Sequence, residues 1–380
     1  MGRPKKEEKK VELHAHTIKK SFDASYPAEA VLMDSRKNRV GVVAFTEHDS
    51  EGPFDEEQRA NGEDMSLPIY IKDGITCIRA VELSVSCGIF NPPVKFHLLV
   101  YGADFSENSP LSRLIKVKKV NNDFVSYSVL YHLSKRLGVT PSQLYIKDFV
   151  MEKRKNGSFF NRFDAKSSIE FMDTYDLTGG RSEREMTKIL RKVPRPKRLY
   201  VDIRDAMKII HASGGMAVMA HPGRTLANMD PAKREIFIKN LLELGLDGAE
   251  LIHNGSNKEI NDLFIKCMDE HYTVNEYVVT GGGDVHHKGD KCTIGQANGN
   301  DITMKDVEVF LKELYKLQYE RKHGLRSHRV YPEVSDIEIE SLIDKYETLG
   351  ATFRQEWIDE VARNDTQLLA ETSDQNKPKK

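Results

Sequence analysis

The chain has 380 residues, which is enough for one large domain with an insertion or for two or three smaller domains. Its 57 Lys and Arg residues are balanced by 58 Asp and Glu residues, so the net charge of −1 excludes a chain that is basic overall, and any basic surface must be local. We expect a cytoplasmic protein without a membrane segment, because no apolar run has membrane-spanning length, no secretion signal opens the chain and the four cysteines form no C-x-x-C pair.

The first predicted strand follows a charged leader, residues 1–10, and carries two histidines, His14 and His16. Side chains alternate between the two faces of a strand, so residues two apart point the same way and both imidazoles can reach one metal ion. Taken alone the pair is a weak signal, because two surface or core histidines at this spacing also occur by chance.

Later apolar runs also carry a histidine or a carboxylate near one end. Runs rich in Val and Ile between turn residues predict buried strands, and we expect these strands to be parallel. A helix over residues 27–39 leads into the second strand, and Glu82 is expected to end the third. Polar residues at the C-terminal ends of successive strands are how a barrel builds an active site. The runs with their polar residues are 42–49, 75–82, 96–100, 216–222 and 277–286.

Between Gly102 and Tyr200 the strand pattern gives way to helical spacing over residues 111–137 and 166–190. Residues 181–198 contain eight basic and two acidic side chains, enough to hold a polyanion by phosphate contacts. A solvated helix face followed by a proline-broken linker is the more ordinary explanation of the same residues.

From residue 201 the alternation of helix and strand resumes, as a wound barrel requires. Helices are expected over residues 203–213, 232–245 and 258–271, with a strand at 248–252. Beyond residue 301 the pattern is helical, with a second apolar face over 337–349, and residues 369–380 are expected to be a disordered tail. The first apolar face after residue 301 is formed by Val307, Phe310, Leu311, Leu314 and Leu317.

Six motifs, taken together and in order, resemble the PHP family, named for its polymerase and histidinol-phosphatase members, and most of all its small bacterial phosphoesterases. They are ELHAHT, FTEHD, AVELS, FHLLVYG, MAHPGR and TGGGDVHH, and the resemblance spans residues 11–290. It implies an α/β protein with a distorted (β/α)7-type barrel over residues 11–104 and 201–300 and a metal site at the C-terminal ends of the strands. It also implies a helical insertion over the active site at 105–200, and it leaves 301–368 as a helical C-terminal extension.

The resemblance further implies nine metal ligands that hold three divalent ions. The first ion would take His14, His16, Glu82 and Asp284, the second Asp23, His48 and His286, and the third Glu82, His97 and His221. Mixed imidazole and carboxylate ligation suits Mn, Fe or Zn. Asp49, next to His48, could orient a ligand imidazole, and Arg224 could bind a substrate phosphate near the metals.

We therefore predict a metal-dependent phosphoric ester hydrolase. Its partner would be a small phosphorylated molecule, such as a nucleotide or nucleoside bisphosphate, or a short oligonucleotide, attacked by a metal-activated hydroxide at a trinuclear site. An exonuclease or DNA-repair phosphoesterase that uses the basic insertion is an alternative. A non-catalytic, metal-stabilised PHP scaffold is another. The sequence assigns no protein partner.

Overall fold

The computed structural model describes residues 8–17, 20–21, 24–139, 145–146, 148–149, 165–191, 196–273, 276–287, 293–329 and 331–375. The chain divides into two compact units. Unit 1 comprises residues 1–116 and 200–343, and unit 2 comprises residues 117–199 and 344–380. No helix within the described residues is long and apolar enough to cross a membrane.

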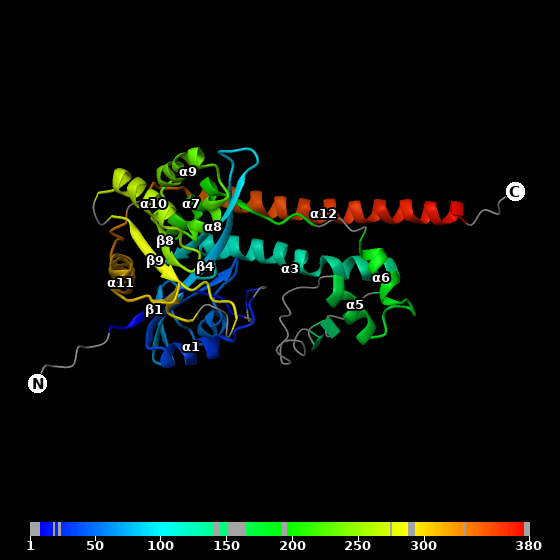
Figure 1. Cartoon of the computed structure of the whole chain (residues 1–380), viewed down its shortest axis with the longest axis horizontal. Helices are drawn as coiled ribbons and strands as arrows, with labels where there is room; N and C mark the ends of the chain where they lie inside the picture. The colour runs from blue at the N-terminus through cyan, green and yellow to red at the C-terminus, as the bar shows by residue number, and fades with distance from the viewer. Residues whose placement is uncertain are drawn as a thin grey trace, which may run out of the picture. The chain divides into compact units, whose positions relative to one another are not determined.

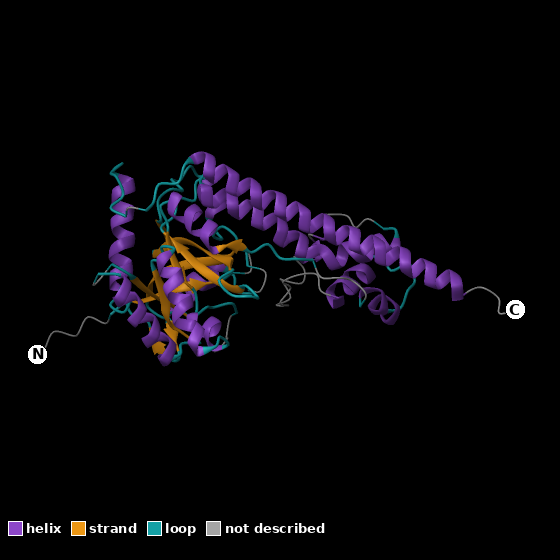
Figure 2. Cartoon of the chain, turned by 90° about the horizontal axis from the view of Figure 1, so that it is seen from above, coloured by secondary structure: helices purple, strands orange, loops and turns teal. Residues whose placement is uncertain are grey.

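Unit 1 is built on a mixed sheet of nine strands, which lie in its middle with helices around them (Figures 1 and 2). Seven strands follow one another in the order β1-β2-β4-β5-β7-β8-β9, and β3 and β6 pair with β4. An isolated parallel bridge pairs Val285, just after β9, with Ala15 at the end of β1, so the last strand of this order also contacts the first. The strands are β1 (Lys10–Ala15), β2 (Val40–His48), β3 (Ile69–Lys72), β4 (Ile75–Cys87), β5 (Val94–Tyr101), β6 (Val201–Asp202), β7 (Met216–Met219), β8 (Gly248–His253) and β9 (Val278–Gly282), with a separate pair, β10 (Gln296–Ala297) and β11 (Asn300–Asp301).

Among the strands that the sequence predicted, the expectation of parallel pairing is wrong for β5, and the short strand β3 is also antiparallel to β4. The pairs β1–β2, β2–β4, β7–β8 and β8–β9 are parallel, but β5 runs antiparallel to both β4 and β7. A short connection, residues 88–93, joins β4 to β5, and a connection of this length forms a hairpin rather than a parallel crossover. For the same reason Glu82 does not end its strand, because β4 continues to Cys87 as one arm of the hairpin.

The helices of unit 1 largely follow the sequence pattern. Those expected before the second strand and after residue 201 are confirmed, and Gly214, with φ +67°, follows α7. A short helix, α2, lies in the acidic connection after β2. The helices are α1 (Ala28–Lys37), α2 (Asp55–Ala60), α7 (Ile203–Ala212), α8 (Pro222–Ala227), α9 (Pro231–Glu243), α10 (Lys258–His271) and α11 (Glu308–Lys322).

The buried polar residues lie on the same strand faces as the residues of the hydrophobic core. Because side chains alternate, Ile78, Ala80 and Glu82 share one face of β4, and the first two belong to the main hydrophobic cluster. On β5 the same face carries Tyr101 and Leu99 and then His97. The predicted apolar face of α11 is confirmed, since its five residues belong to this cluster. The polar side chains therefore continue the faces that line an apolar core.

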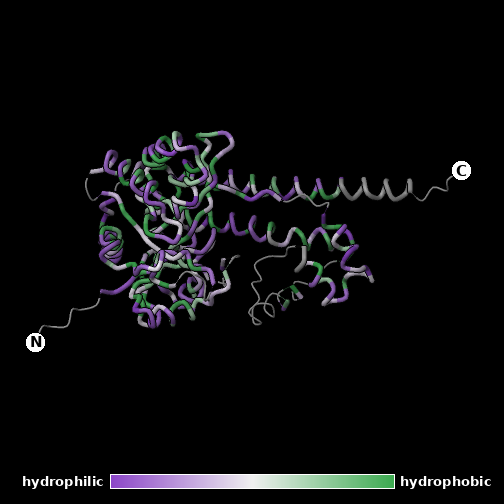
Figure 3. Tube along the Cα trace, viewed as in Figure 1, coloured by the Kyte–Doolittle hydropathy of each residue, from purple (hydrophilic) through white to green (hydrophobic). Residues whose placement is uncertain are grey.

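Unit 2 is helical. Its core includes Leu133, Phe171, Met172 and Met186. Helices α3 (Pro110–Leu137) and α12 (Asp336–Gln375) begin in unit 1 and run into unit 2, which also holds α5 (Ala165–Thr174) and α6 (Glu183–Leu190). Hydrophilic and hydrophobic residues alternate along the coloured part of α12 in Figure 3.

Helix α12 continues to Gln375, within the tail expected at 369–380, and the disorder of this tail stays a prediction. Residues 376–380 lie outside the described residues. The placement of the insertion over the active site stays a prediction.

Lowering the pH should destabilise unit 2 through His132 of α3. Burial, reinforced by the positive charges of Arg136 and Lys135, lowers the pKa of this fully buried histidine from 6.5 to about 4. Between these two values the unfolded chain binds a proton that the folded chain does not. This contribution to stability is therefore complete above pH 6.5 and falls by up to about 3 kcal/mol as the pH drops toward 4.

The single tryptophan provides the measurement. Trp357 packs against Phe124 and Tyr131, so its fluorescence reports on the unfolding of unit 2. Denaturant titrations at pH 7.5 and pH 5 should show a smaller loss of stability for His132→Leu, which cannot take up a proton, than for the wild type. Equal losses in the two proteins would contradict this prediction.

Candidate metal centre

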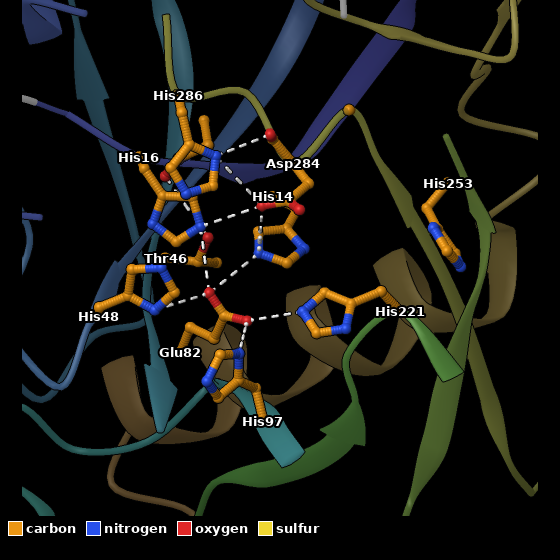
Figure 4. Close-up of polar contacts among 12 residues, drawn as sticks. His14, His16, Thr46, His48, Glu82, His97, His221, His253, Asp284 and His286 are labelled. Carbon is orange, nitrogen blue, oxygen red and sulfur yellow. Dashed lines mark hydrogen bonds and ion pairs between the residues drawn. The ribbon is translucent and has the colours of Figure 1, made fainter. Parts of the chain in front are cut away.

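The structure brings eight of the nine predicted ligands together at one end of the sheet (Figure 4). They come from β1, β2, β4, β5, the end of β7 and the turn after β9, segments that are far apart in the sequence. The ninth, Asp23, lies outside the described residues. The eight are His14, His16, His48, Glu82, His97, His221, Asp284 and His286.

Glu82 is at the centre of this group and is fully buried. Five imidazole nitrogens lie between 2.7 and 3.3 Å from its carboxylate oxygens: Oε2 is near His14, His16 and His48, and Oε1 is near His97 and His221. Burial alone would raise the pKa of Glu82, but the charges of the surrounding imidazoles outweigh burial and hold the pKa well below its usual range. This carboxylate can therefore stay ionised at the centre of a buried cluster.

Three overlapping groups of side chains have ligand atoms within 4.8 Å of one another. They are His14, His16, Glu82 and Asp284; His16, His48 and His286; and His48, Glu82 and His97. The first group is the set predicted for the first ion. The other two share residues with the remaining predicted sets, and His221 also reaches this region, with its Nε2 3.0 Å from Glu82 Oε1. Buried imidazole nitrogens that face carboxylate oxygens are a donor set that fits divalent ions such as Mn, Fe or Zn.

The backbone is unusual at this end of the sheet. His221, Asp284 and Asp49 have positive φ values of 30°, 53° and 49°, a region that residues other than glycine rarely occupy and that is often found at functional sites. Gly282, which ends β9, is needed for space: a Cβ at this position would lie 2.4 Å from the Cβ of His14. The chain thus brings the end of β9 against His14 of β1.

Arg224 and Asp49 border the cluster in different ways. Arg224, in the first turns of α8, forms an ion pair with Asp284 through Nη1, and half of its side chain is exposed. It can therefore face both solvent and the cluster. Asp49 Oδ1 and Oδ2 accept hydrogen bonds from the backbone N–H and the hydroxyl of Ser84 at 2.8 and 2.9 Å. These contacts join the end of β2 to β4, and an interaction of Asp49 with a ligand imidazole stays a prediction.

Sequence reasoning missed three fully buried glutamates beside the cluster, Glu12, Glu47 and Glu250. Glu250 Oε1 lies 2.9 Å from His14 Nδ1, and its Oε2 accepts a hydrogen bond from the backbone N–H of His221. Burial raises the pKa values of Glu12 and Glu47 to about 7, against hydrogen bonds that lower them. A signal was present, because each of these glutamates interrupts an apolar strand, and a charged residue buried there requires partners.

Comparisons with known proteins agree with this architecture. No family model matches the chain. A curated protein of Eggerthella lenta, phosphoribosyl 1,2-cyclic phosphate 1,2-diphosphodiesterase, is 37% identical over 89 residues, which are 23% of this chain and 30% of that protein. The match thus spans less than a third of this relative.

Two solved structures are similar over most of the chain. One, from Bifidobacterium adolescentis, is described as a "putative metal-dependent phosphoesterase"; it has a TM-score of 0.50 and 16% identity over 80% of this chain and 95% of that one. The other is an amidohydrolase from Chromobacterium violaceum with bound sulfate and no metal, with a TM-score of 0.52 and 21% identity over 81% and 96%. At these identities the likeness establishes the fold: this chain has the α/β fold of these two proteins, with a buried His, Glu and Asp cluster.

Proposed function

We propose that the chain is a metal-dependent phosphoesterase that hydrolyses a small phosphorylated substrate. One observation carries this proposal, namely the buried carboxylate of Glu82 with five imidazole nitrogens around it. Asp284 and Glu250 also face these histidines, but five imidazolium ions would outnumber the three carboxylates, and the surplus positive charge is unfavourable in a low dielectric. Burial, with the nearby His286 and His48, lowers the pKa of His16 to about 4, so this ring is neutral and has a lone pair to offer a metal ion.

The proposed ligand sets are those implied by the family resemblance. His14, His16, Glu82 and Asp284 would hold the first ion, His48 and His286 with Asp23 the second, and Glu82, His97 and His221 the third. Bound divalent ions would lower the pKa of a water molecule and supply a hydroxide at neutral pH.

Arg224 would bind the phosphoryl oxygens of the substrate. A guanidinium suits this role because it forms charge-assisted, paired hydrogen bonds with phosphate. Half of its side chain is exposed and accessible to a substrate, and its ion pair with Asp284 places it next to the proposed first ion. Asp49 would keep the ends of β2 and β4, and with them His48 and Glu82, in register through its two hydrogen bonds to Ser84.

The substrates that we favour are nucleotides, nucleoside bisphosphates and short oligonucleotides. The curated relative from Eggerthella lenta is named for a cyclic phosphodiester of ribose, and its 89 matched residues support adding such a compound to the substrates that are tested. Both kinds of substrate combine a phosphoester with a ribose.

A nuclease that uses the insertion is the second candidate, and one surface in unit 2 favours it. Arg184, Lys188 and Arg191 are exposed at intervals of four and three residues along and just after α6, so they share one face of the helix. Residues 192–195 of the predicted basic stretch lie outside the described residues. Substrate affinity that falls steeply with salt would support the nuclease, because phosphate contacts release counterions.

The test is phosphate release by metal-stripped protein to which Mn, Zn or Fe is restored. The substrates are mononucleotides, nucleoside 3′,5′-bisphosphates, a cyclic ribose phosphodiester with a phosphatase to release its product phosphate, histidinol phosphate and short single-stranded DNA and RNA. Activity on a small phosphate that disappears in His14→Ala and Asp284→Ala is the expected result. Activity on oligonucleotides alone would replace the proposal with the nuclease. Bound metal without any turnover would replace it with the non-catalytic scaffold.

A further inference from the structure

Ser21, in the connection between β1 and α1, contacts three residues in or beside the metal centre. Its side chain is buried, and its Oγ lies 2.5 Å from Glu47 Oε2, 3.1 Å from His16 Nδ1 and 3.1 Å from the backbone nitrogen of His48. Glu47 comes just before His48 in β2 and points to the opposite face of the strand. The serine hydroxyl therefore connects a buried carboxylate to His16, which directly follows β1.

The directions of these three hydrogen bonds follow from the chemistry of the groups. The backbone N–H of His48 can only donate, so Ser21 Oγ accepts from it. An ionised carboxylate can only accept, so the single hydroxyl proton of Ser21 goes to Glu47. Ser21 then has no proton left for His16, and the contact at 3.1 Å requires that His16 Nδ1 carries a proton and donates it.

A neutral imidazole with its proton on Nδ1 has its lone pair on Nε2. His16 Nε2 lies 3.1 Å from Glu82 Oε2 and 3.4 Å from Asp284 Oδ1, within the group of side chains proposed to hold the first ion. We propose that Glu47 is a positioning residue that acts through Ser21 to hold His16 in the Nδ1–H tautomer, so that Nε2 is ready to bind a metal ion. This inference rests on the metal centre of the proposed function.

The neighbouring histidine is held in a similar way without an intermediary. Glu250 Oε1 lies 2.9 Å from His14 Nδ1, and His14 Nε2 faces Glu82 and Asp284 at 3.3 and 3.4 Å. His14, on β1, and His16, just after it, thus receive their orienting carboxylates from different strands, β8 and β2. Partners of this kind fix the tautomer and the ring orientation of a ligand, and their loss typically costs about 10–100-fold in metal affinity.

Glu47→Leu is the sharpest test because it removes the carboxylate and keeps roughly the size of the side chain. Glu47 Oε2 accepts hydrogen bonds from both Ser21 Oγ and the backbone N–H of Thr17, the latter at 3.0 Å, so leucine leaves the Ser21 hydroxyl without its acceptor. The hydroxyl proton would turn toward His16 Nδ1, and the proton of His16 would move to Nε2, where it blocks metal binding. Glu47→Gln is the matched control, because its amide oxygen can take the place of Oε2 and accept both hydrogen bonds. Ser21→Ala, which removes the connection entirely, is the second variant.

The readout is the tautomer of His16 in metal-free protein, measured by nitrogen–proton correlation NMR on protein with 15N-labelled histidine and assigned with His16→Gln. The measurement is made at pH 8.5, so that Glu47, which already accepts hydrogen bonds from the backbone and hydroxyl of Thr17 and from Ser21, is ionised. Affinity for Mn²⁺, measured by competition with a chelator, is the second readout. Ser21→Thr retains the hydroxyl and should behave as the wild type. Ser35→Ala is the matched control, since Ser35 is a fully buried serine whose hydroxyl bonds to the Val31 carbonyl in α1.

We expect His16 to be protonated on Nδ1 in the wild type and in Glu47→Gln. It should populate the Nε2–H form in both Glu47→Leu and Ser21→Ala, with Mn²⁺ affinity lowered about 10–100-fold in these two variants. The proposal is overturned if His16 carries its proton on Nε2 in the wild type, or if its tautomer is the same in the wild type and in folded Ser21→Ala. Because the tautomer is read without metal or substrate, a shift in the variants combined with absent phosphate release would sink the proposed function and leave this inference standing.

Discussion

Replacing Glu82 by glutamine should lower phosphate release at least about 10³-fold, which corresponds to about 4 kcal/mol of lost transition-state stabilisation. Glutamine keeps the size of the side chain but loses the negative charge that now faces five imidazole nitrogens. Because Glu82 belongs to two of the three ligand groups, one substitution should also reduce the number of bound divalent ions. Phosphate release and elemental analysis of the same preparation measure both effects.

A matched control distinguishes the role of Glu82 from a general effect of removing charge. Glu308 begins α11 and forms only a surface ion pair, to Lys312, among the described interactions. Glu308→Gln should leave both activity and metal content unchanged. If Glu82→Gln retained full activity with its full metal content, the assignment of Glu82 as the central ligand would be wrong.

Replacing Arg224 by alanine should lower kcat/KM about 10²-fold while the metal content stays the same. The loss is expected because a preorganised cation at the edge of the cluster stabilises the charge that develops on the phosphoryl oxygens. Metal binding should not weaken, since removing a cation from Asp284 leaves that carboxylate more available to a metal ion. Steady-state kinetics together with metal analysis separate these two effects.

Two further variants make the Arg224 test specific. Arg224→Lys should recover part of the activity, because lysine keeps the charge but not the paired hydrogen-bond geometry. Arg204→Ala removes a comparably exposed arginine at the start of α7, whose carboxylate partner is Asp202, and should have no effect. Loss of metal from Arg224→Ala would show that this residue supports the metal centre instead of the substrate.

The candidate ligands could be predicted because each is a His, Asp or Glu in or next to an otherwise apolar run of the sequence. The apolar run of β2 ends in His48. On β4, Glu82 follows Ile78 and Ala80 on one face of the strand. In both cases a polar side chain stands at the end of a buried apolar stretch. The order of these exceptions along the chain then carried the family resemblance. Eight of the nine residues accordingly lie together, although their segments are distant in sequence.

The features that escaped prediction depend on pairing between distant segments. The reversed direction of β5 follows from its hairpin with β4 and its pairing with β7, and no apolar run by itself encodes direction. The partners of Glu250 lie on β1 and after β7, so its role could not be inferred from the residues around it. The role of Ser21 could not be predicted from the sequence either, because it depends on which group donates the proton in each of its three hydrogen bonds.

The number of divalent ions bound per chain is the measurement that tests the central claim most directly. Metal-stripped protein would be reconstituted with Mn²⁺, freed of excess ion and analysed for metal, beside His14→Ala and Asp284→Ala. The three proposed ligand sets predict three ions per wild-type chain and fewer in both variants. Wild-type protein that retains no ion, or variants that retain as many as the wild type, would contradict the account.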